Sequence, residues 1–185
     1  MKFNGTYELN STKEQVWKNL NDTNILKECI DGCKEFANIE NNKYKALILV
    51  KLGPVNASFQ SIIEIKNIIE EESYDLIATG NARQLGHASG NINVALKENK
   101  NKTILSYSAE TRINGKLAQL GSRLIDGSVK KNTDLFFKNF SKILDNNIVE
   151  IEKTRNVKKV SSIKLFFFTA IIVLLILIYL SFYAK

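Results

Sequence analysis

The residue types that most often carry enzyme chemistry are scarce in this chain of 185 residues. Histidine is the commonest general base in enzymes, and the chain has a single one, His87. His87 alternates with Ser89 and Asn91 along a predicted strand, opposite the apolar residues of the same strand. We therefore expect an exposed histidine that faces away from any binding site, and the sequence predicts no catalytic residue.

Two cysteines, Cys29 and Cys33, lie four positions apart in the segment CIDGC. Neither a second cysteine pair nor a histidine cluster accompanies them in the sequence, so we predict no metal site. We interpret both cysteines as reduced thiols with a structural or incidental role. A redox switch is the alternative.

Two further features could bind a charged group. Gly80, Gly86 and Gly90 do not form a GxGxxG motif, and no helix follows them to receive a phosphate, so we predict no dinucleotide cofactor, and no cofactor at all. Arg123 lies among apolar residues. It could hold an anionic or carbonyl group at the mouth of a cavity, or pair with a structural carboxylate.

The most distinctive stretch of the chain is a run without charge at residues 165–183. Its 19 residues would extend about 28 Å as a helix, enough to cross the hydrocarbon core of a bilayer. The first nine residues form a short stretch in which polar and apolar side chains alternate, unlike a signal peptide. We therefore predict a single-pass membrane protein that is anchored by its tail.

The positive charge of the chain is concentrated next to this run. The chain has a formal net charge of +7, but residues 1–150 hold 20 basic and 18 acidic residues. The remaining +5 comes from Lys153, Arg155, Lys158, Lys159, Lys164 and Lys185 against Glu152. All of these but Lys185 lie in residues 148–164, a basic linker of the kind that anionic lipid headgroups attract. This distribution argues against a nucleic-acid partner. By the positive-inside tendency, it places the soluble domain, residues 1–147, in the cytoplasm.

The longest periodic segment before the tail covers residues 114–147. Apolar residues recur there at three- and four-residue spacing, opposite a polar stripe, which predicts one long amphipathic helix. Gly121 and Gly127 fall inside it, and each would cost about 1 kcal/mol relative to alanine. Close approach of the helix backbone to the sheet would explain these glycines, and so would a cavity left by the missing side chains. The two explanations can both hold.

Over most of the rest of the domain, apolar and polar residues alternate, as they do in strands. Residues 2–9 predict a half-buried strand, and two short helices follow, the first capped by Ser11 and Glu14, the second starting at Asp22. Residues 33–113 predict about six antiparallel strands with one covered face. The expected fold class is α+β, a curved antiparallel sheet gripping one long C-terminal helix, with a transmembrane helix beyond it.

The element order and three motifs resemble a known family. Residues 20–33 (LNDTNILKECIDGC), 50–55 (VKLGPV) and 115–125 (GKLAQLGSRLI) are similar to those of the carbon monoxide dehydrogenase G-subunit family, in the START-like, helix-grip superfamily (SRPBCC). The resemblance covers residues 1 to about 145. It implies an apolar ligand held between sheet and helix, and an accessory protein beside a molybdenum hydroxylase.

Two functions follow as hypotheses. The first is a membrane-anchored carrier or binding protein for an apolar small molecule, for which a quinone is one candidate. The second is an assembly or membrane-recruitment factor for that enzyme with no ligand of its own. A cyclase-like or hydrolase-like enzyme is disfavoured, because no histidine is expected on the inner face. For the first hypothesis, the residues expected to line the cavity are Trp17, Phe59, Ile63, Leu76, Ile92, Tyr107, Leu117, Leu120, Gly121 and Leu124.

Overall fold

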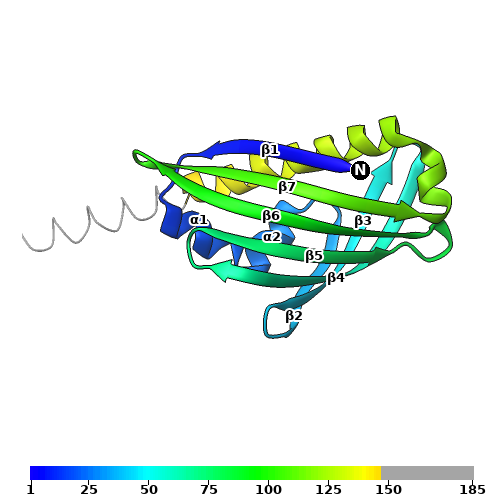
Figure 1. Ribbon diagram of the computed structural model, residues 1–185, viewed down its shortest axis with the longest axis horizontal. Coiled ribbons are helices and arrows are strands. Elements are labelled where there is room, and N and C mark those ends of the chain that lie inside the picture. The colour runs from blue at the N-terminus through cyan, green and yellow to red at the C-terminus, as the bar shows by residue number, and fades with distance from the viewer. Residues whose placement is uncertain (147–185) are drawn as a thin grey trace, which may run out of the picture. The chain divides into compact units, whose positions relative to one another are not determined.

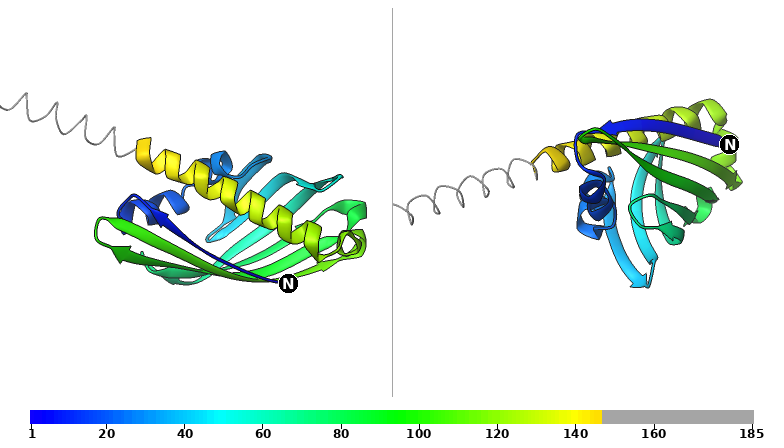
Figure 2. Two further views of the ribbon diagram at one scale, coloured as in Figure 1. Left: turned by 90° about the horizontal axis from the view of Figure 1, so that it is seen from above. Right: turned by 60° about the vertical axis from the view of Figure 1, so that its left-hand side comes forward.

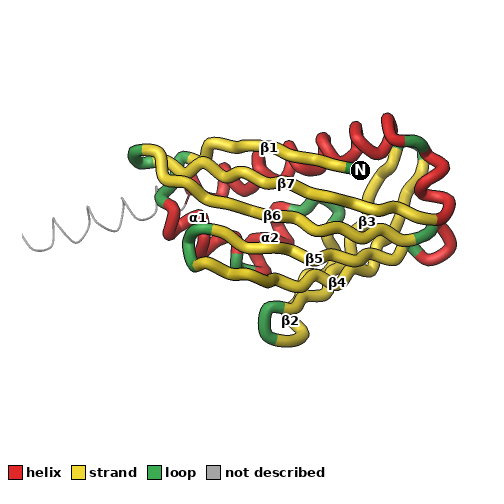
Figure 3. The backbone as a smooth tube through the Cα atoms, in the orientation of Figure 1, coloured by secondary structure: helices red, strands yellow, loops and turns green. Residues whose placement is uncertain are grey.

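A computed structural model of the chain describes residues 1–146. The described part holds seven strands, two short α-helices, two 3-10 helices and one long C-terminal helix (Figure 3). The strands are β1 (Lys2–Leu9), β2 (Cys33–Glu40), β3 (Lys43–Leu52), β4 (Val55–Ile69), β5 (Ser73–Asn81), β6 (His87–Asn99) and β7 (Lys102–Asn114). The helices are α1 (Lys13–Leu20), α2 (Thr23–Cys29), η1 (Arg83–Leu85), η2 (Gly115–Leu120) and the C-terminal helix, helical over residues 122–146.

All seven strands form one antiparallel sheet in the order β1-β7-β6-β5-β4-β3-β2 (Figure 1). Strands β2 to β7 follow one another through hairpins, and a two-residue turn joins Leu52 to Val55 across Gly53, whose φ of 60° suits glycine. The first strand is the exception, because β1 pairs with β7 at the far end of the order. The predicted antiparallel sheet, with one strand before the short helices and six after them, is confirmed.

The C-terminal helix lies across one face of the curved sheet, and α1 and α2 lie on that same side (Figure 2). The side of the helix toward the sheet buries Ile125, Phe137, Phe140 and Leu144. Tyr7 of β1 holds it in place, because its ring stacks on Phe137 with centroids 3.8 Å apart. The Tyr7 hydroxyl also donates to Asp134 Oδ1 at 2.9 Å. The predicted grip of sheet on helix is confirmed.

The start of the long helix differs from the prediction. Residues 115–120 form the 3-10 helix η2, and Gly121 follows with a φ of 81°, a left-handed conformation that favours glycine. The α-helix begins only at residue 122. The continuous helix predicted from residue 114 was therefore wrong over its first eight positions, and Gly121 is a connection between two helices.

Gly127 does lie inside the helix, but neither explanation offered for it holds. A Cβ built on Gly127 meets no heavy atom within 4 Å, so the backbone does not approach the sheet closely there. The residue is exposed and does not line the cavity described below. Gly127 therefore lies on the outer surface of the helix, where it lowers the stability of the helix relative to alanine.

The caps of the two short helices differ slightly from the prediction. The N-cap of α1 is Thr12, whose hydroxyl accepts from the backbone N–H of Gln15 at 3.3 Å. Ser11, predicted as the cap, instead donates from its hydroxyl to Gln15 Oε1 at 2.7 Å. Asp22 caps α2 and accepts from the backbone N–H of Asn24 at 2.8 Å. The boundary at Asp22 is as predicted, and the first cap lies one residue later.

The glycines provide a paired prediction for stability. A Cβ on Gly5 would lie 2.6 Å from Cε1 of Tyr107, whose ring stacks with Tyr7 and Phe137, so Gly5→Ala should lower the free energy of unfolding by about 1–3 kcal/mol. Gly127→Ala meets open space in a helix and should raise it by about 0.5–1 kcal/mol. Urea denaturation measures both, and a destabilised Gly127→Ala would contradict the exposed helical position.

The predicted linker at residues 148–164 and the predicted membrane span at residues 165–183 lie outside the described residues. Within residues 1–146, no helix is long and apolar enough to cross a membrane. Residues 1–145 form a compact unit by themselves.

Candidate functional site

A cavity of about 640 Å³ lies between the inner face of the sheet and the C-terminal helix. Residues from all seven strands line it, together with the end of α1, α2 and the segment after it, η2 and the helix. Sites for small molecules and cofactors usually have volumes of about 300–1,000 Å³ and mostly apolar walls. The size and lining of this cavity are those of a ligand site, and its place between sheet and helix is the one that the family resemblance implied.

Small residues on two neighbouring strands leave much of this space. Ala78 pairs with Gly90 and Gly80 pairs with Ala88 across the β5–β6 ladder, and all four line the cavity. Side chains of neighbouring strands lean over the two glycines, because a Cβ on Gly80 would lie 3.1 Å from Phe59 Cδ1 and one on Gly90 would lie 3.0 Å from Thr111 Cγ2. These small residues form the floor of the cavity at the centre of the sheet.

Six of the ten residues predicted to line a cavity do so, and four do not. Those that line it are Phe59, Ile63, Leu76, Ile92, Tyr107 and Leu117. Those outside its lining are Trp17, Leu120, Gly121 and Leu124. The role of all ten in binding a ligand stays a prediction.

Each of the four predicted residues outside the lining is absent from it for a different reason. Trp17 lies behind the wall, with its ring edge-on to Tyr74 and centroids 5.5 Å apart. Leu120 packs on a small apolar cluster that includes Leu117. Gly121 is an exposed connection, and Leu124 is 43% exposed because the helix begins later, and with a different phase, than predicted.

The side of the helix that faces the sheet contributes residues to the cavity wall that were not predicted from the sequence pattern. Phe137, Asn132 and Thr133 line the cavity. Asn132 Nδ2 donates to the Ser128 carbonyl and the Thr133 hydroxyl donates to the Val129 carbonyl, each at 2.9 Å. These bonds within the helix satisfy polar groups that face an apolar space. The signal available in the sequence was helical spacing, because Asn132 and Thr133 lie three and four residues after Val129, and Phe137 lies four residues after Thr133.

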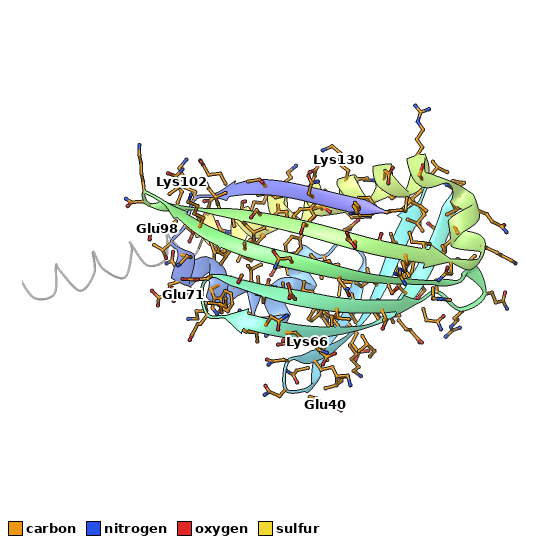
Figure 4. All side chains as sticks on the ribbon, in the orientation of Figure 1. Glu40, Lys66, Glu71, Glu98, Lys102 and Lys130 are labelled. Atoms are coloured by element: carbon orange, nitrogen blue, oxygen red, sulfur yellow. The ribbon has the colours of Figure 1, made fainter. Side chains whose placement is uncertain are left out.

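Charge is nearly absent from the wall. Within residues 1–146, Asp31 is the only charged residue that lines the cavity. The charged side chains labelled in Figure 4 lie at the periphery of the domain, on hairpins, strand ends and the outer side of the helix. An anionic ligand would therefore find no basic partner in the described wall.

The candidates for chemistry lie elsewhere. His87 is exposed, as predicted, and its Nε2 lies 3.0 Å from Asn114 Nδ2. Arg123 is exposed and does not line the cavity, and it makes no ion pair within residues 1–146, so both alternatives offered for it are wrong for that region. The same residues contain no group of three or more His, Cys, Asp or Glu that could hold a metal ion.

The two cysteines should react slowly. Burial raises the pKa of the Cys29 thiol to about 11, and it also raises the pKa of Cys33 above its usual value. At pH 8 only about 0.1% of Cys29 is then thiolate, the reactive form, so alkylation by iodoacetamide should be slow and should speed up as the pH rises. Mass spectrometry over time measures this. Fast modification at pH 8 would revive the redox-switch alternative.

The arrangement defines a class of protein. A curved antiparallel sheet that holds one long helix, with an apolar cavity between them, is the helix-grip architecture of the START-like superfamily (SRPBCC). The family of the G subunit of carbon monoxide dehydrogenase (CoxG) has a pattern that matches residues 5–145 of this chain. The chain therefore belongs to the CoxG family.

Solved structures agree with this assignment. A conserved protein from Geobacillus kaustophilus is 32% identical, with a TM-score of 0.75, over 79% of this chain and 96% of that one. The protein TTHA0849 from Thermus thermophilus shares the fold at 9% identity and a TM-score of 0.60, over 80% and 99%. The Zhui aromatase/cyclase from Streptomyces sp. R1128 does so at 12% identity and 0.58, over 80% and 95%. A search of the curated proteins finds no match to this chain.

Proposed function

We propose that this protein is a membrane-anchored carrier or binding protein for an uncharged, apolar small molecule. The observation that carries the proposal is the cavity of about 640 Å³, with Asp31 as its only charged wall residue within residues 1–146. Burying apolar ligand surface there is favourable by roughly 25 cal/mol per Å². A quinone is one candidate, because it is apolar and resides in membranes.

Membership of the CoxG family supports an accessory role beside a molybdenum hydroxylase of the carbon monoxide dehydrogenase type. The chemistry would then belong to the partner enzyme, and this chain would supply binding. In agreement with this, the only histidine of the chain is exposed and outside the cavity lining.

The membrane part of the proposal rests on the sequence. Residues 165–183 carry no charge over a length that spans a bilayer, and the basic residues of 148–164 favour the cytoplasmic side for the domain. A binding domain tethered in this way would meet membrane-soluble molecules at the bilayer surface. A protease added outside intact cells should leave residues 1–146 uncut, and digestion of the domain would reverse the proposed orientation.

Mass spectrometry of bound molecules tests the binding function. The full chain is purified from its membranes and extracted with organic solvent, beside an Ala78→Leu variant whose added side chain would occupy the cavity. We expect an apolar molecule at a stoichiometric amount in the wild type and little in the variant. Equal amounts in both would indicate carried-over lipid. A wild type without any bound molecule, and without affinity for a neutral apolar probe, would leave membrane recruitment of the enzyme as the better account.

A further inference from the structure

Tyr74 is the most buried of the three tyrosines that line the cavity, the others being Tyr44 and Tyr107. The side chain comes from the inner face of β5, beside Val94 of β6, and only 6% of its surface is exposed. Trp17 contacts the ring edge-on, and both belong to the larger apolar core cluster. The ring is therefore held firmly in the wall of the cavity.

The Tyr74 hydroxyl makes no hydrogen bond with any residue in the range 1–146, and the hydroxyl of Thr111, which also lines the cavity, is a second one there without a partner. Buried tyrosine hydroxyls normally have a partner, because leaving such a group unpaired in an apolar place costs roughly 1–3 kcal/mol. Phenylalanine would fill the same space without this cost. An unpaired phenol in the wall of a ligand-sized cavity is explained if the ligand supplies the acceptor.

The phenol is available only as a neutral donor. Burial raises the pKa of Tyr74 well above its usual range, and the nearby Tyr44 raises it further. The group therefore stays protonated at every pH at which the protein works.

The acceptor on the ligand is expected to be uncharged. No Lys, Arg or His lines the described wall, and the one charged residue there, Asp31, is itself negative. A carboxylate would lose its hydration without gaining a cationic partner, which is far more costly than burying a ketone or an ester oxygen.

We propose that Tyr74 is the polar anchor of the cavity, donating a hydrogen bond to a neutral oxygen acceptor, such as a carbonyl, on an otherwise apolar ligand. The inference rests on the proposed binding function and narrows its ligand class. Dispersion and apolar burial supply most of the affinity, and the Tyr74 hydroxyl fixes the orientation and selects for the acceptor. An alkane and an ionised fatty acid of the same length are the molecules that it discriminates against.

Competition against a neutral fluorescent probe tests this. The full chain is reconstituted in phosphatidylcholine vesicles, and N-phenyl-1-naphthylamine accepts energy from Trp17, the only tryptophan of the chain, next to Tyr74. The competitors are 2-undecanone, undecane and undecanoate. Each is compared between the wild type and Tyr74→Phe in the same vesicles, so that partitioning into lipid cancels. Tyr7→Phe is the matched control, because its hydroxyl binds Asp134 outside the cavity lining.

In the wild type and in Tyr7→Phe, 2-undecanone should compete about three- to tenfold better than undecane, as expected for one hydrogen bond. Tyr74→Phe should remove that preference while leaving competition by undecane unchanged. Undecanoate should compete least. A preference for the ketone that persists in Tyr74→Phe, or tighter binding of undecanoate, overturns the anchor while leaving the binding function intact. Failure of the probe to bind the wild type at all overturns both.

Thermal unfolding without added ligand gives a second, independent readout. Removing an unpaired buried hydroxyl should leave the Tm of Tyr74→Phe unchanged or slightly higher. A clearly lower Tm, or a variant that fails to fold, would mean that the hydroxyl has a structural partner, and the proposal would fall.

Discussion

An Ala78→Leu variant is expected to lose at least about tenfold in affinity for a neutral apolar probe, which corresponds to about 1.4 kcal/mol, while its Tm hardly changes. Ala78 lies on the floor of the cavity, where the larger side chain has room and takes the place of ligand. Fluorescence titration and thermal unfolding of the same samples measure the two effects separately.

Ala57→Leu is the matched control for this prediction. Ala57 is 1% exposed and does not line the cavity, and it packs in a cluster with Leu52, Ala82 and Leu117. The same substitution there should lower the free energy of unfolding by about 1–3 kcal/mol through overpacking. If Ala78→Leu loses as much stability as Ala57→Leu, the space above Ala78 is filled by protein, and the binding function loses its main support.

The second large effect concerns the helix. Phe140 is fully buried and stacks on Phe136 with centroids 5.8 Å apart, so Phe140→Ala should lower the free energy of unfolding by about 3–5 kcal/mol. Leu124→Ala, at a position that is 43% exposed, should change it by less than about 0.5 kcal/mol. Urea denaturation followed by Trp17 fluorescence measures both. A large loss at Leu124 would mean that the helix is rotated from the arrangement described here.

The strands were predictable from the sequence because their side chains alternate with a fixed period of two. Once Phe59 was placed on the inner face, Ser61, Ile63 and Ile65 followed, and all four line the cavity. Pairing along the ladders then brought residues such as Ile92 and Tyr107 into the same wall. Local pattern and final position agree there because a strand has little freedom to rotate.

The helix was harder to predict, because which of its residues face the sheet depends on where the helix begins. Leu117, Leu120 and Leu124 have helical spacing, but a left-handed Gly121 separates the first two from the third. A φ of 81° leaves no mark in the sequence beyond the glycine itself. The sequence also could not decide whether the helix packs directly on the sheet or leaves a cavity. That outcome depends on how far the helix lies from the sheet, and no local pattern encodes this distance.

The place of β1 in the sheet affects the order in which the domain can assemble. Strands β2 to β7 each pair with a neighbour in sequence, but β1 pairs with β7, and the backbone contact from Thr111 to Met1 joins residues 110 positions apart. Contacts between residues so distant in sequence form slowly, because a long loop must close first. During synthesis, β1 stays unpaired until β7 has been made, and the helix is made after β7. The cavity is therefore among the last features of the domain to be completed, and translation that stops before the helix leaves the apolar inner face of the sheet exposed and prone to aggregation.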